Sequence, residues 1–191
     1  QDIAQVSISS LRQAIGGVQQ DPFLFTAAVD HNVAYADPSA GMDQIVQAST
    51  DAQIHSFIEE LPKNYQTLVG EDGVSLSGGQ KQRISIARGT LTDAPILIFD
   101  DATAAIDAGT EQYIRRALHE RAGAHTTIII SHRLVSMMHA DEILFLEEGR
   151  IVERGTHKQL LALRERYFAL HSLQLRDENQ LAPLNEQIEP A

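Results

Sequence analysis

The stretch VSLSGGQKQRISIARG, at residues 74–89, places a serine and two glycines directly before a segment with three cationic side chains. Ser77 is a favoured N-cap residue and Gln80 completes a capping box, so we expect a helix from about Gln80 to Arg88. The free N–H groups and positive dipole end of such a helix bind anions, and glycines let a phosphate approach them. The segment predicts a phosphate-binding loop, although SGG taken alone is more often a flexible turn.

Two carboxylates, Asp100 and Asp101, follow the apolar run ILIF. The run predicts a buried strand of a parallel sheet, and α/β sheets bind ligands at the carboxyl ends of their strands. The pair is a candidate reaction site, although a solvated strand end or a helix cap explains the pair alone equally well. His132 follows the next apolar run, TTIII, and Gln20 follows GGVQ, a possible strand. Taken alone, each of these two residues is more typical of an ordinary loop than of a functional site.

The composition of the chain excludes or disfavours several classes of protein. The chain has 191 residues, 43% of them hydrophobic, which is enough for one domain with a packed core. Its formal net charge of -11 disfavours nucleic acid as a partner, because binding a phosphate backbone needs a basic face. The lack of cysteine excludes disulfides and cysteine-ligated metal sites, and no apolar run approaches the roughly 18 residues of a membrane-spanning helix. We therefore expect a soluble, cytosolic chain.

The elements that must position these residues fall into two regions. Residues 21–90 are predicted to be mostly helical, because MDQIVQAS and DAQIHSFIEEL carry apolar residues at helical spacing and Pro62 ends the second. From residue 91 onward, apolar runs and helical patterns alternate, which predicts an α/β fold with a parallel sheet and an antiparallel edge. Buried strands are expected at PILIF and TTIII, and between them a helix at GTEQYIRRALHER with Tyr113, Ile114, Ala117 and Leu118 on one face. A hairpin is expected around Glu148 and Gly149. It is followed by a helix at THKQLLALRERYFALHSL, with a capping box of Thr156 and Gln159, and by a loose tail at 176–191.

Together these segments resemble the ATP-binding cassette (ABC) family over residues 1–175, and all of them occur in the family's order. LSGGQKQRISIAR resembles the ABC signature, ILIFDD resembles Walker B with the catalytic position after it, and ATAAID resembles the D-loop. His132 resembles the switch histidine, and Gln20, before DPFLF, resembles the glutamine of the Q-loop. TLVGEDGVSLSGGQ is similar to an exporter-type stretch in which Glu71 would contact a transmembrane domain.

The resemblance implies a P-loop NTPase-like (RecA-like) parallel sheet core with an ABC α-helical subdomain and an antiparallel edge hairpin. It implies that the helical subdomain, with the Q-loop and the signature, occupies residues 21–90. The α/β core, with Walker B, the D-loop and the switch histidine, would occupy residues 91–175, and a flexible tail residues 176–191.

The family also implies that two such domains dimerise head to tail and enclose two ATP molecules. The signature of one chain would bind the γ-phosphate of the ATP held by its partner, through Ser77, Gly78, Gly79 and Gln80. In the chain's own site, the resemblance implies that Asp100 binds Mg²⁺ and that Gln20 contacts Mg²⁺ or the attacking water. Asp101 would be catalytic, and His132 would contact the γ-phosphate. Asp107, as the aspartate of the D-loop, would lie at the dimer interface. Catalysis would then consist mostly of positioning and charge stabilisation.

One departure from the family pattern is the missing Walker A motif, G-x-x-x-x-G-K-[ST]. The chain's three lysines are Lys63, Lys81 and Lys158, and none of them follows a glycine. We therefore expect a C-terminal fragment of a longer exporter, with Walker A and the transmembrane helices upstream. Such a fragment alone would bind ATP weakly and would not hydrolyse it. The alternative is a natural protein without Walker A that acts as a non-hydrolysing partner.

The second departure is Asp101, where the family's usual residue is glutamate. Aspartate is one methylene shorter, and a displacement of about 1 Å can cost on the order of 100-fold in rate. Asp101 thus resembles the degenerate half of heterodimeric exporters, in which an intact signature serves the partner's active site. LSGGQ is intact here, and so is His132, which such halves often lose.

The sequence therefore predicts the ATP-hydrolysing portion of an ABC exporter at the cytoplasmic face of the plasma membrane. The predicted partners are a second nucleotide-binding domain, as a homodimer or heterodimer, and the transmembrane domain of an exporter. One alternative is a soluble ABC ATPase without a transporter, which the exporter-like TLVGEDGVSLSGGQ and the acidic charge disfavour. The other is a regulatory ABC domain that dimerises without hydrolysing ATP.

Overall fold

The computed structural model describes residues 1–70, 73–92, 94–121 and 126–185, and the chain divides into two compact units, residues 1–131 and 132–191. In chain order the elements are η1 (Ile3–Gln5), α1 (Ile8–Gln13), β1 (Ile15–Val18), β2 (Ala27–Ala28), α2 (Val29–Val33), η2 (Ala34–Ala36), α3 (Met42–Asp51), α4 (His55–Glu60), η3 (Asn64–Gln66), β3 (Leu68–Val69), α5 (Gly78–Leu91), β4 (Ile96–Asp100), α6 (Ala108–Arg121), β5 (Thr126–Ile130), α7 (Leu134–Met137), β6 (Ile143–Glu147), β7 (Arg150–Gly155), α8 (His157–Leu163) and α9 (Arg166–Asn185).

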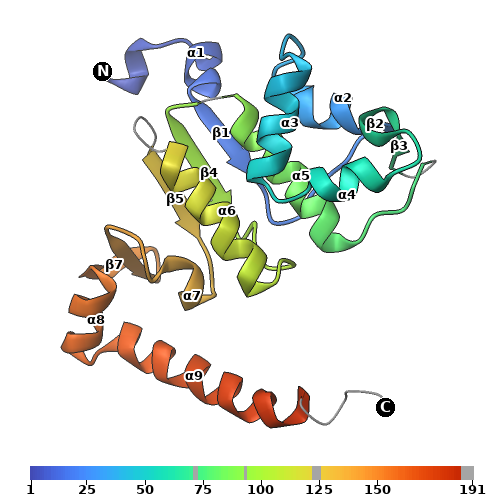
Figure 1. Ribbon diagram of the computed structural model, residues 1–191. Coiled ribbons are helices and arrows are strands. Elements are labelled where there is room, and N and C mark those ends of the chain that lie inside the picture. The colour runs from blue at the N-terminus through green and yellow to red at the C-terminus, as the bar shows by residue number, and fades with distance from the viewer. Residues whose placement is uncertain (71–72, 93, 122–125, 186–191) are drawn as a thin grey trace. The chain divides into compact units, whose positions relative to one another are not determined.

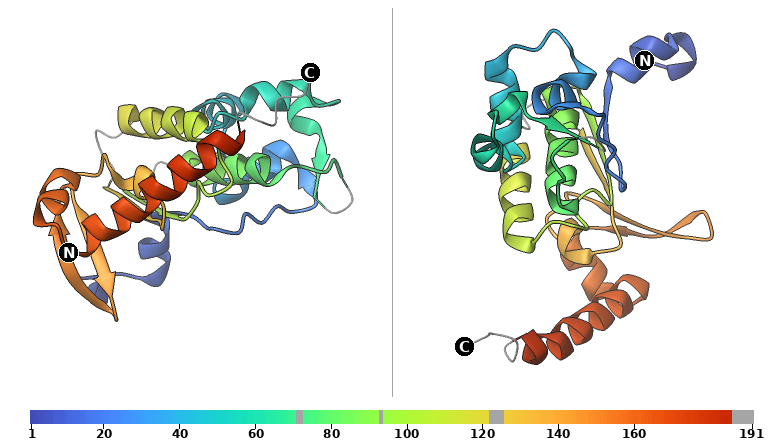
Figure 2. Two further views of the ribbon diagram at one scale, coloured as in Figure 1. Left: turned by 90° about the horizontal axis from the view of Figure 1, so that it is seen from below. Right: turned by 90° about the vertical axis from the view of Figure 1, so that its right-hand side faces the viewer.

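The first unit is built on a parallel sheet in the order β1-β4-β5 (Figure 1). The register pairs Val18 with Phe99 across β1 and β4, and Phe99 with Ile129 across β4 and β5. Parallel neighbours need long crossover connections, which here are the helical segment between β1 and β4 and then α6. Helices α5 and α6 lie on the same side of this sheet (Figure 2). The predicted α/β fold with a parallel sheet is confirmed.

Helix α5 lies directly against β1, and two glycines permit this contact. A Cβ atom added to Gly89 would lie 2.6 Å from Cγ2 of Val18. One added to Gly16 would lie 2.8 Å from the carbonyl oxygen of Gly89. Real Cβ atoms do not approach that closely, so a side chain at either position would push helix and strand apart. The close contact fixes the axis of α5 relative to the sheet.

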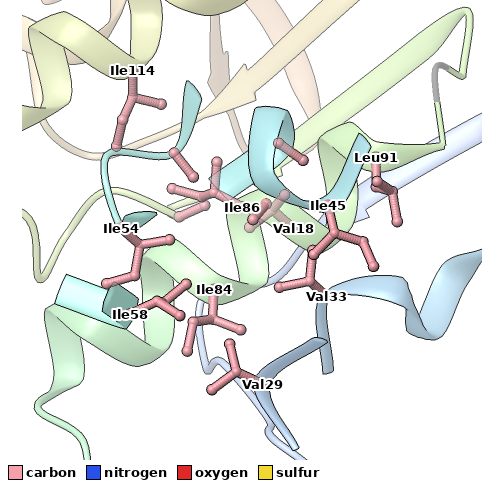
Figure 3. Packing of buried hydrophobic residues seen from close by; sticks show 14 of the residues in the cluster. Val18, Val29, Val33, Ile45, Ile54, Ile58, Ile84, Ile86, Leu91 and Ile114 are labelled. Atoms are coloured by element: carbon pink, nitrogen blue, oxygen red, sulfur yellow. The ribbon is translucent and has the colours of Figure 1, made fainter. Parts of the chain in front are cut away.

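The rest of α5 is held by the core of the first unit (Figure 3). Ile84 and Ile86 of α5 are buried among side chains from α2, α3 and α4, including Val33, Ile45 and Ile58. Burying an isoleucine or valine side chain stabilises the fold by about 1.5–3 kcal/mol relative to leaving it exposed. The helical segment and the sheet therefore share one core, and α5 runs through it.

The second unit contains the predicted hairpin, α7, α8 and α9. Strands β6 and β7 pair antiparallel and form their own two-stranded sheet. Glu148 and Gly149 join them with φ values of 49° and 74°, the left-handed conformations that a two-residue hairpin turn requires. A small core of Leu134, Ile143, Leu160 and Tyr167 holds the unit together.

One predicted helix begins later than the sequence suggested. The pattern DAQIHSFIEEL predicted a helix from Asp51, but Asp51 ends α3 and α4 begins at His55. Gln53 has a φ of 56°, which interrupts the helical path between them. The apolar spacing continues across the break because Ala52 and Ile54 are buried in the same core. The predicted end before Pro62 is correct, since α4 ends at Glu60.

The helix predicted at residues 156–173 is divided in two. Arg164, with a φ of 57°, ends α8 in the left-handed conformation, and α9 starts at Arg166. The buried carboxylate of Glu153 accepts hydrogen bonds from the amides of Arg166, at 2.7 Å, and Tyr167, at 3.1 Å. It therefore caps α9 from outside the helix. Within the predicted tail, α9 continues through Asn185, and residues 186–191 lie outside the described residues.

Two apolar predictions were wrong in detail. TTIII was expected to be buried, but Ile128 and Ile130 are 45% and 52% exposed, whereas Ile129 packs on the core. Successive side chains of a strand point to opposite faces, and only one face of β5 meets the core. On α6, Ile114 is 2% exposed but Tyr113 is 63% exposed, because neighbouring helical residues point about 100° apart.

Candidate functional site

The N-terminus of α5 has the predicted capping box. Oγ of Ser77 accepts from the amide of Gln80 at 3.3 Å, and Oε1 of Gln80 accepts from the amide of Ser77 at 2.8 Å. The helix begins at Gly78, two residues before the predicted start, and ends at Leu91. The amides of Gly78 and Gly79 make no hydrogen bond to any residue that the structure describes. They are the free donors that a helix start offers to an anion.

The turn at residues 101–107 packs against this helix start. A Cβ atom on Gly79 would lie 2.8 Å from the carbonyl oxygen of Ala105, whereas one on Gly78 would meet the side chain of Ala105 at an ordinary 3.8 Å. Behind the glycines, Gln82 is 1% exposed. Its Nε2 donates to the carbonyl of Gln20 at 3.4 Å, and its Oε1 accepts from the amide of Ala105 at 3.3 Å. One buried amide therefore links α5, the turn and the loop at Gln20.

Gln20 and Asp100 leave the sheet at the same edge. Strand β1 ends at Val18, which pairs with Phe99, so the residues that follow in each strand emerge together. Both Gln20 and Asp100 are exposed. A carboxylate and an amide at the carboxyl edge of a parallel sheet are placed where such sheets bind ligands.

Arg88 anchors the segment that follows Gln20. It donates to the carbonyls of Asn32, at 2.8 Å, and Phe23, at 3.0 Å. Its guanidinium lies 5.7 Å from the ring centre of Phe25, within the range of a cation–π contact. Burial lowers the pKa of Arg88, but a guanidinium stays charged at any physiological pH. The loop at Gln20 is therefore tied at both ends to α5.

Asp101 is nearly buried, with 9% of its surface exposed. It starts the turn after β4 with a φ of 48°, a left-handed conformation that aspartate adopts more readily than most residues. Its amide donates to the carbonyl of Ile130 at 2.7 Å, and Oγ of Ser131 donates to its Oδ1 at 3.2 Å. The short carboxylate is therefore bound to the end of β5, which restricts the direction in which it can reach.

Asp107 caps α6. Its Oδ1 accepts from the amide of Thr110 at 2.9 Å. Hydrogen bonds from the amide and hydroxyl of Thr110 lower the pKa of Asp107, and the positive charge of Arg83 lowers it further. Asp107 thus has a structural role in its own chain, and its place at a dimer interface stays a prediction.

The predicted site residues fall in both units: Gln20 and Asp101 belong to the first unit and His132 to the second. His132 is the first residue of the second unit, and its carbonyl accepts from Nε2 of Gln174 at 2.6 Å. Glu71, the predicted contact to a transmembrane domain, lies outside the described residues. The first unit therefore brings together the signature residues, Asp100, Asp101, Gln20 and Asp107.

These residues fit the groups that the ABC resemblance implies. The amides of Gly78 and Gly79, which belong to residues without side chains, suit phosphate oxygens. The exposed carboxylate of Asp100 suits Mg²⁺, which proteins usually hold through one or two carboxylates together with substrate phosphates. In the described part of the chain, no group of three or more histidine, aspartate or glutamate side chains could hold a metal by itself.

Sequence reasoning missed Gln82 and Gln174. Both are polar residues on a helix face that also carries a buried hydrophobic side chain. Gln82 precedes the buried Ile86 by four residues, and Gln174 follows the buried Tyr167 by seven. Residues at these spacings lie on the same face of a helix. A glutamine on a face that packs against the core predicts a side-chain amide that forms hydrogen bonds with the neighbouring backbone.

Comparison with known proteins identifies the family. The sequence profile of the family described as ABC transporter matches residues 1–104. The ATP-dependent lipid A-core flippase of Chromohalobacter salexigens is 46% identical over 176 residues, which are 92% of this chain and 30% of that protein. The ABC transporter ATP-binding protein YknU of Bacillus subtilis is 48% identical over 175 residues, again 92% of this chain and 30% of the relative.

A solved structure is also similar to this chain. It is described as a bacterial Atm1-family ABC exporter with ATP bound, and the match has a TM-score of 0.87 at 44% identity. The match covers 91% of this chain and 30% of the exporter chain. The chain thus spans about 30% of the length of the relatives it matches. No helix in the part that the structure describes is both long and apolar enough to cross a membrane.

Proposed function

The chain belongs to the ABC transporter family, and from this premise we propose that it is part of the nucleotide-binding domain of an ABC exporter. In this role it couples the binding and hydrolysis of ATP to the export of a substrate. The observation that carries the proposal is the start of α5, where the LSGGQ segment has a complete capping box and two unpaired glycine amides. The 44% identity to an exporter described with ATP bound supports the same assignment.

The helix start serves a nucleotide that a second nucleotide-binding domain holds. The amides of Gly78 and Gly79 and the hydroxyl of Ser77 donate to the γ-phosphate, and the dipole of α5 adds a positive potential there. Gln80 holds Ser77 through the capping box and keeps the hydroxyl in place. Two chains arranged head to tail satisfy this geometry, because each helix start then meets the nucleotide of the other chain.

The edge of the sheet serves the chain's own nucleotide. Asp100 binds Mg²⁺, and Gln20 contacts Mg²⁺ or the attacking water. His132 donates to the γ-phosphate. When bound, Mg²⁺ would neutralise negative charge on the phosphates. The contribution of the protein is mostly to position these groups, and the link through Gln82 keeps the loop at Gln20 in register with α5.

The exporter role assigns the remaining partner and the location. A transmembrane domain, contacted by Glu71, places the chain at the cytoplasmic face of the membrane. The names of the relatives, an ATP-dependent flippase and an ABC transporter ATP-binding protein, support this setting. Asp107, which caps α6, then also faces the second nucleotide-binding domain.

Asp101 makes this site slow. Its carboxylate is one methylene shorter than the glutamate usual in the family, and Ser131 holds it at 3.2 Å. An intact glutamate in a partner subunit would then carry most of the hydrolysis. The partner's site still uses the signature of this chain.

The test uses the full-length protein with its natural partner, reconstituted in lipid vesicles. We expect ATP hydrolysis that requires Mg²⁺ and accompanies export. No hydrolysis in the presence of Mg²⁺ would refute the proposed function. Asp101→Glu should raise the total rate, and Asp101→Asn should change it little. Loss of all turnover in Asp101→Asn would instead make Asp101 a working general base and refute only the slow site.

A further inference from the structure

Gln174 of α9 forms two short hydrogen bonds with the segment that carries His132. Its Nε2 donates to the carbonyl of His132 at 2.6 Å, and its Oε1 accepts from the amide of Leu134 at 3.0 Å. The second distance lies within the usual range for N–H···O hydrogen bonds, and the first is slightly shorter than that range. One side-chain amide therefore fixes the backbone on both sides of Arg133.

The geometry explains why an amide fits there. Arg133 is extended, with φ of -94° and ψ of 111°. In an extended chain the carbonyl before a residue and the amide after it point to the same side, as they do toward a neighbouring strand. A primary amide carries an NH₂ group that can donate to the carbonyl and an oxygen that can accept from the amide. Gln174 also acts as an N-cap for α7, because its Oε1 accepts from the first amide of that helix, which the side chain of the N-cap residue Arg133 does not cap.

Helix α9 is itself firmly held within the second unit. Tyr167 is fully buried in the core that also contains Leu134, so the helix and the segment share one cluster. The carboxylate of Glu153 caps the start of α9, and the hydroxyl of Tyr167 lies 2.7 Å from Nδ1 of His157. These contacts set the position of Gln174, since it lies two turns beyond Tyr167 on the same face.

We propose that Gln174 is a positioning residue for His132: it holds the backbone of residues 132–134 so that the histidine side chain leaves the chain in one fixed direction. This inference rests on the proposed function, in which His132 contacts the γ-phosphate. It adds that α9, although distant in sequence from every motif, controls the rate of hydrolysis. Without the amide, the segment could rotate about Arg133 and the histidine would lose its alignment.

The test compares three variants of the full-length protein in lipid vesicles. Gln174→Met keeps the length of the side chain and removes both bonds. Gln174→Glu keeps the acceptor for the amide of Leu134 but places a carboxylate against the carbonyl of His132. Ser172→Ala is the control, because its hydroxyl donates within α9, to the carbonyl of Phe168 at 2.8 Å. His132→Ala, in the same subunit, sets the scale for complete loss of the histidine.

Two readouts separate positioning from stability. Hydrogen–deuterium exchange of peptides covering residues 131–138 should become faster in Gln174→Met and less so in Gln174→Glu, and should not change in Ser172→Ala. At the site that contains His132, kcat should fall by roughly 10-fold or more in both Gln174 variants, while KM for ATP changes by less than about twofold. Steady-state kinetics with a partner subunit that cannot hydrolyse ATP isolate this site and give both kcat and KM.

The outcomes distinguish the two proposals. Unchanged exchange in Gln174→Met would show that the amide does not hold the segment. Faster exchange with unchanged kcat, in a protein that His132→Ala inactivates, would overturn the positioning role and leave the proposed function intact. A wild-type protein that does not hydrolyse ATP would overturn the proposed function and, with it, the role of Gln174 in the rate. Because Gln174→Glu preserves size and one bond, it replaces Gln174→Met if that variant does not fold.

Discussion

The helices α5 and α8 begin with the same local structure but differ in the residues of their first turns. Ser77 with Gln80 and Thr156 with Gln159 form two capping boxes. In the first, the hydroxyl accepts at 3.3 Å and the glutamine at 2.8 Å, and in the second the distances are 3.4 Å and 2.9 Å. The hydrogen bonds that start the two helices are therefore nearly identical.

The two helix starts differ in the two residues that follow each N-cap. In α5 they are Gly78 and Gly79, and the carbonyl of Ala105 closes on the second of them. In α8 they are His157 and Lys158, whose side chains stand at the helix start. Helix α5 also has 14 residues and α8 only 7, so α5 has the larger dipole. A capping box thus sets where a helix begins, and the glycines with the adjacent turn set whether it can bind a phosphate.

The largest expected effect comes from a bulky cation at the first N-cap. Ser77→Arg would place a long side chain over the amides of Gly78 and Gly79 and prevent a phosphate from reaching them. We expect it to abolish hydrolysis at the site whose nucleotide the partner subunit holds. Thr156→Arg is the matched control and should leave hydrolysis unchanged. Single-turnover assays of the full transporter measure both, and an active Ser77→Arg would remove this helix start from the reaction.

The second effect concerns close packing. Gly79→Ala would bring a Cβ atom to 2.8 Å from the carbonyl oxygen of Ala105, so either α5 or the turn at residues 101–107 must move. We expect a loss of roughly 10- to 100-fold in hydrolysis at the partner-held nucleotide, since displacements of about 1 Å have such effects. Lys158→Ala, at the corresponding position of α8, should have none. Equal rates for Gly79→Ala and the wild type would show that the contact tolerates a methyl group.

Both capping boxes and the hairpin at Glu148 and Gly149 could be predicted from the sequence, because their hydrogen bonds and turn conformations involve residues close together in the chain. The parallel sheet was predictable for a different reason: its strands pair across long stretches of chain, but buried parallel strands appear in the sequence as apolar runs that alternate with helical patterns. The start of α4 and the break before α9 were not. Gln53 and Arg164 adopt left-handed conformations, which residues other than glycine, asparagine and aspartate seldom do, so neither residue type signals a break in the helix.

The candidate site also contains features that were predictable from the local sequence and features that were not. The segments of Ser77, Asp100 and Gln20 follow local patterns, so their types and order were sufficient to select them. The contacts of Gln82 with Gln20 and Ala105 join residues 62 and 23 positions apart. No local pattern encodes such contacts. They follow from the fold, in which a glutamine on a buried helix face must find partners for its amide.

A smaller effect separates stability from binding. Ser77→Ala and Thr156→Ala each remove an N-cap hydroxyl, which should cost about 1 kcal/mol of local helix stability. Hydrogen exchange of the first turns of α5 and α8 in the full-length protein measures this cost. Only Ser77→Ala should also raise KM for ATP at the partner-held site. If both variants raised KM equally, general loss of stability rather than a phosphate contact would explain the effect.

The smallest effect is a pH dependence confined to the second helix start. Burial lowers the pKa of His157 below its ordinary value near 6.5, and the nearby His171 and His139 lower it further. The unfolded state therefore binds a proton more readily than the folded state, so this contribution to stability is fully present above pH 6.5 and is lost as the pH falls through the lowered pKa. Exchange of the α8 amides should thus accelerate relative to α5 in acid. His157→Asn should reduce this difference, whereas His119→Asn, on the exposed side of α6, should preserve it. Because α5 has a glycine where α8 has His157, an equal acid response in both helices would mean that another group is responsible.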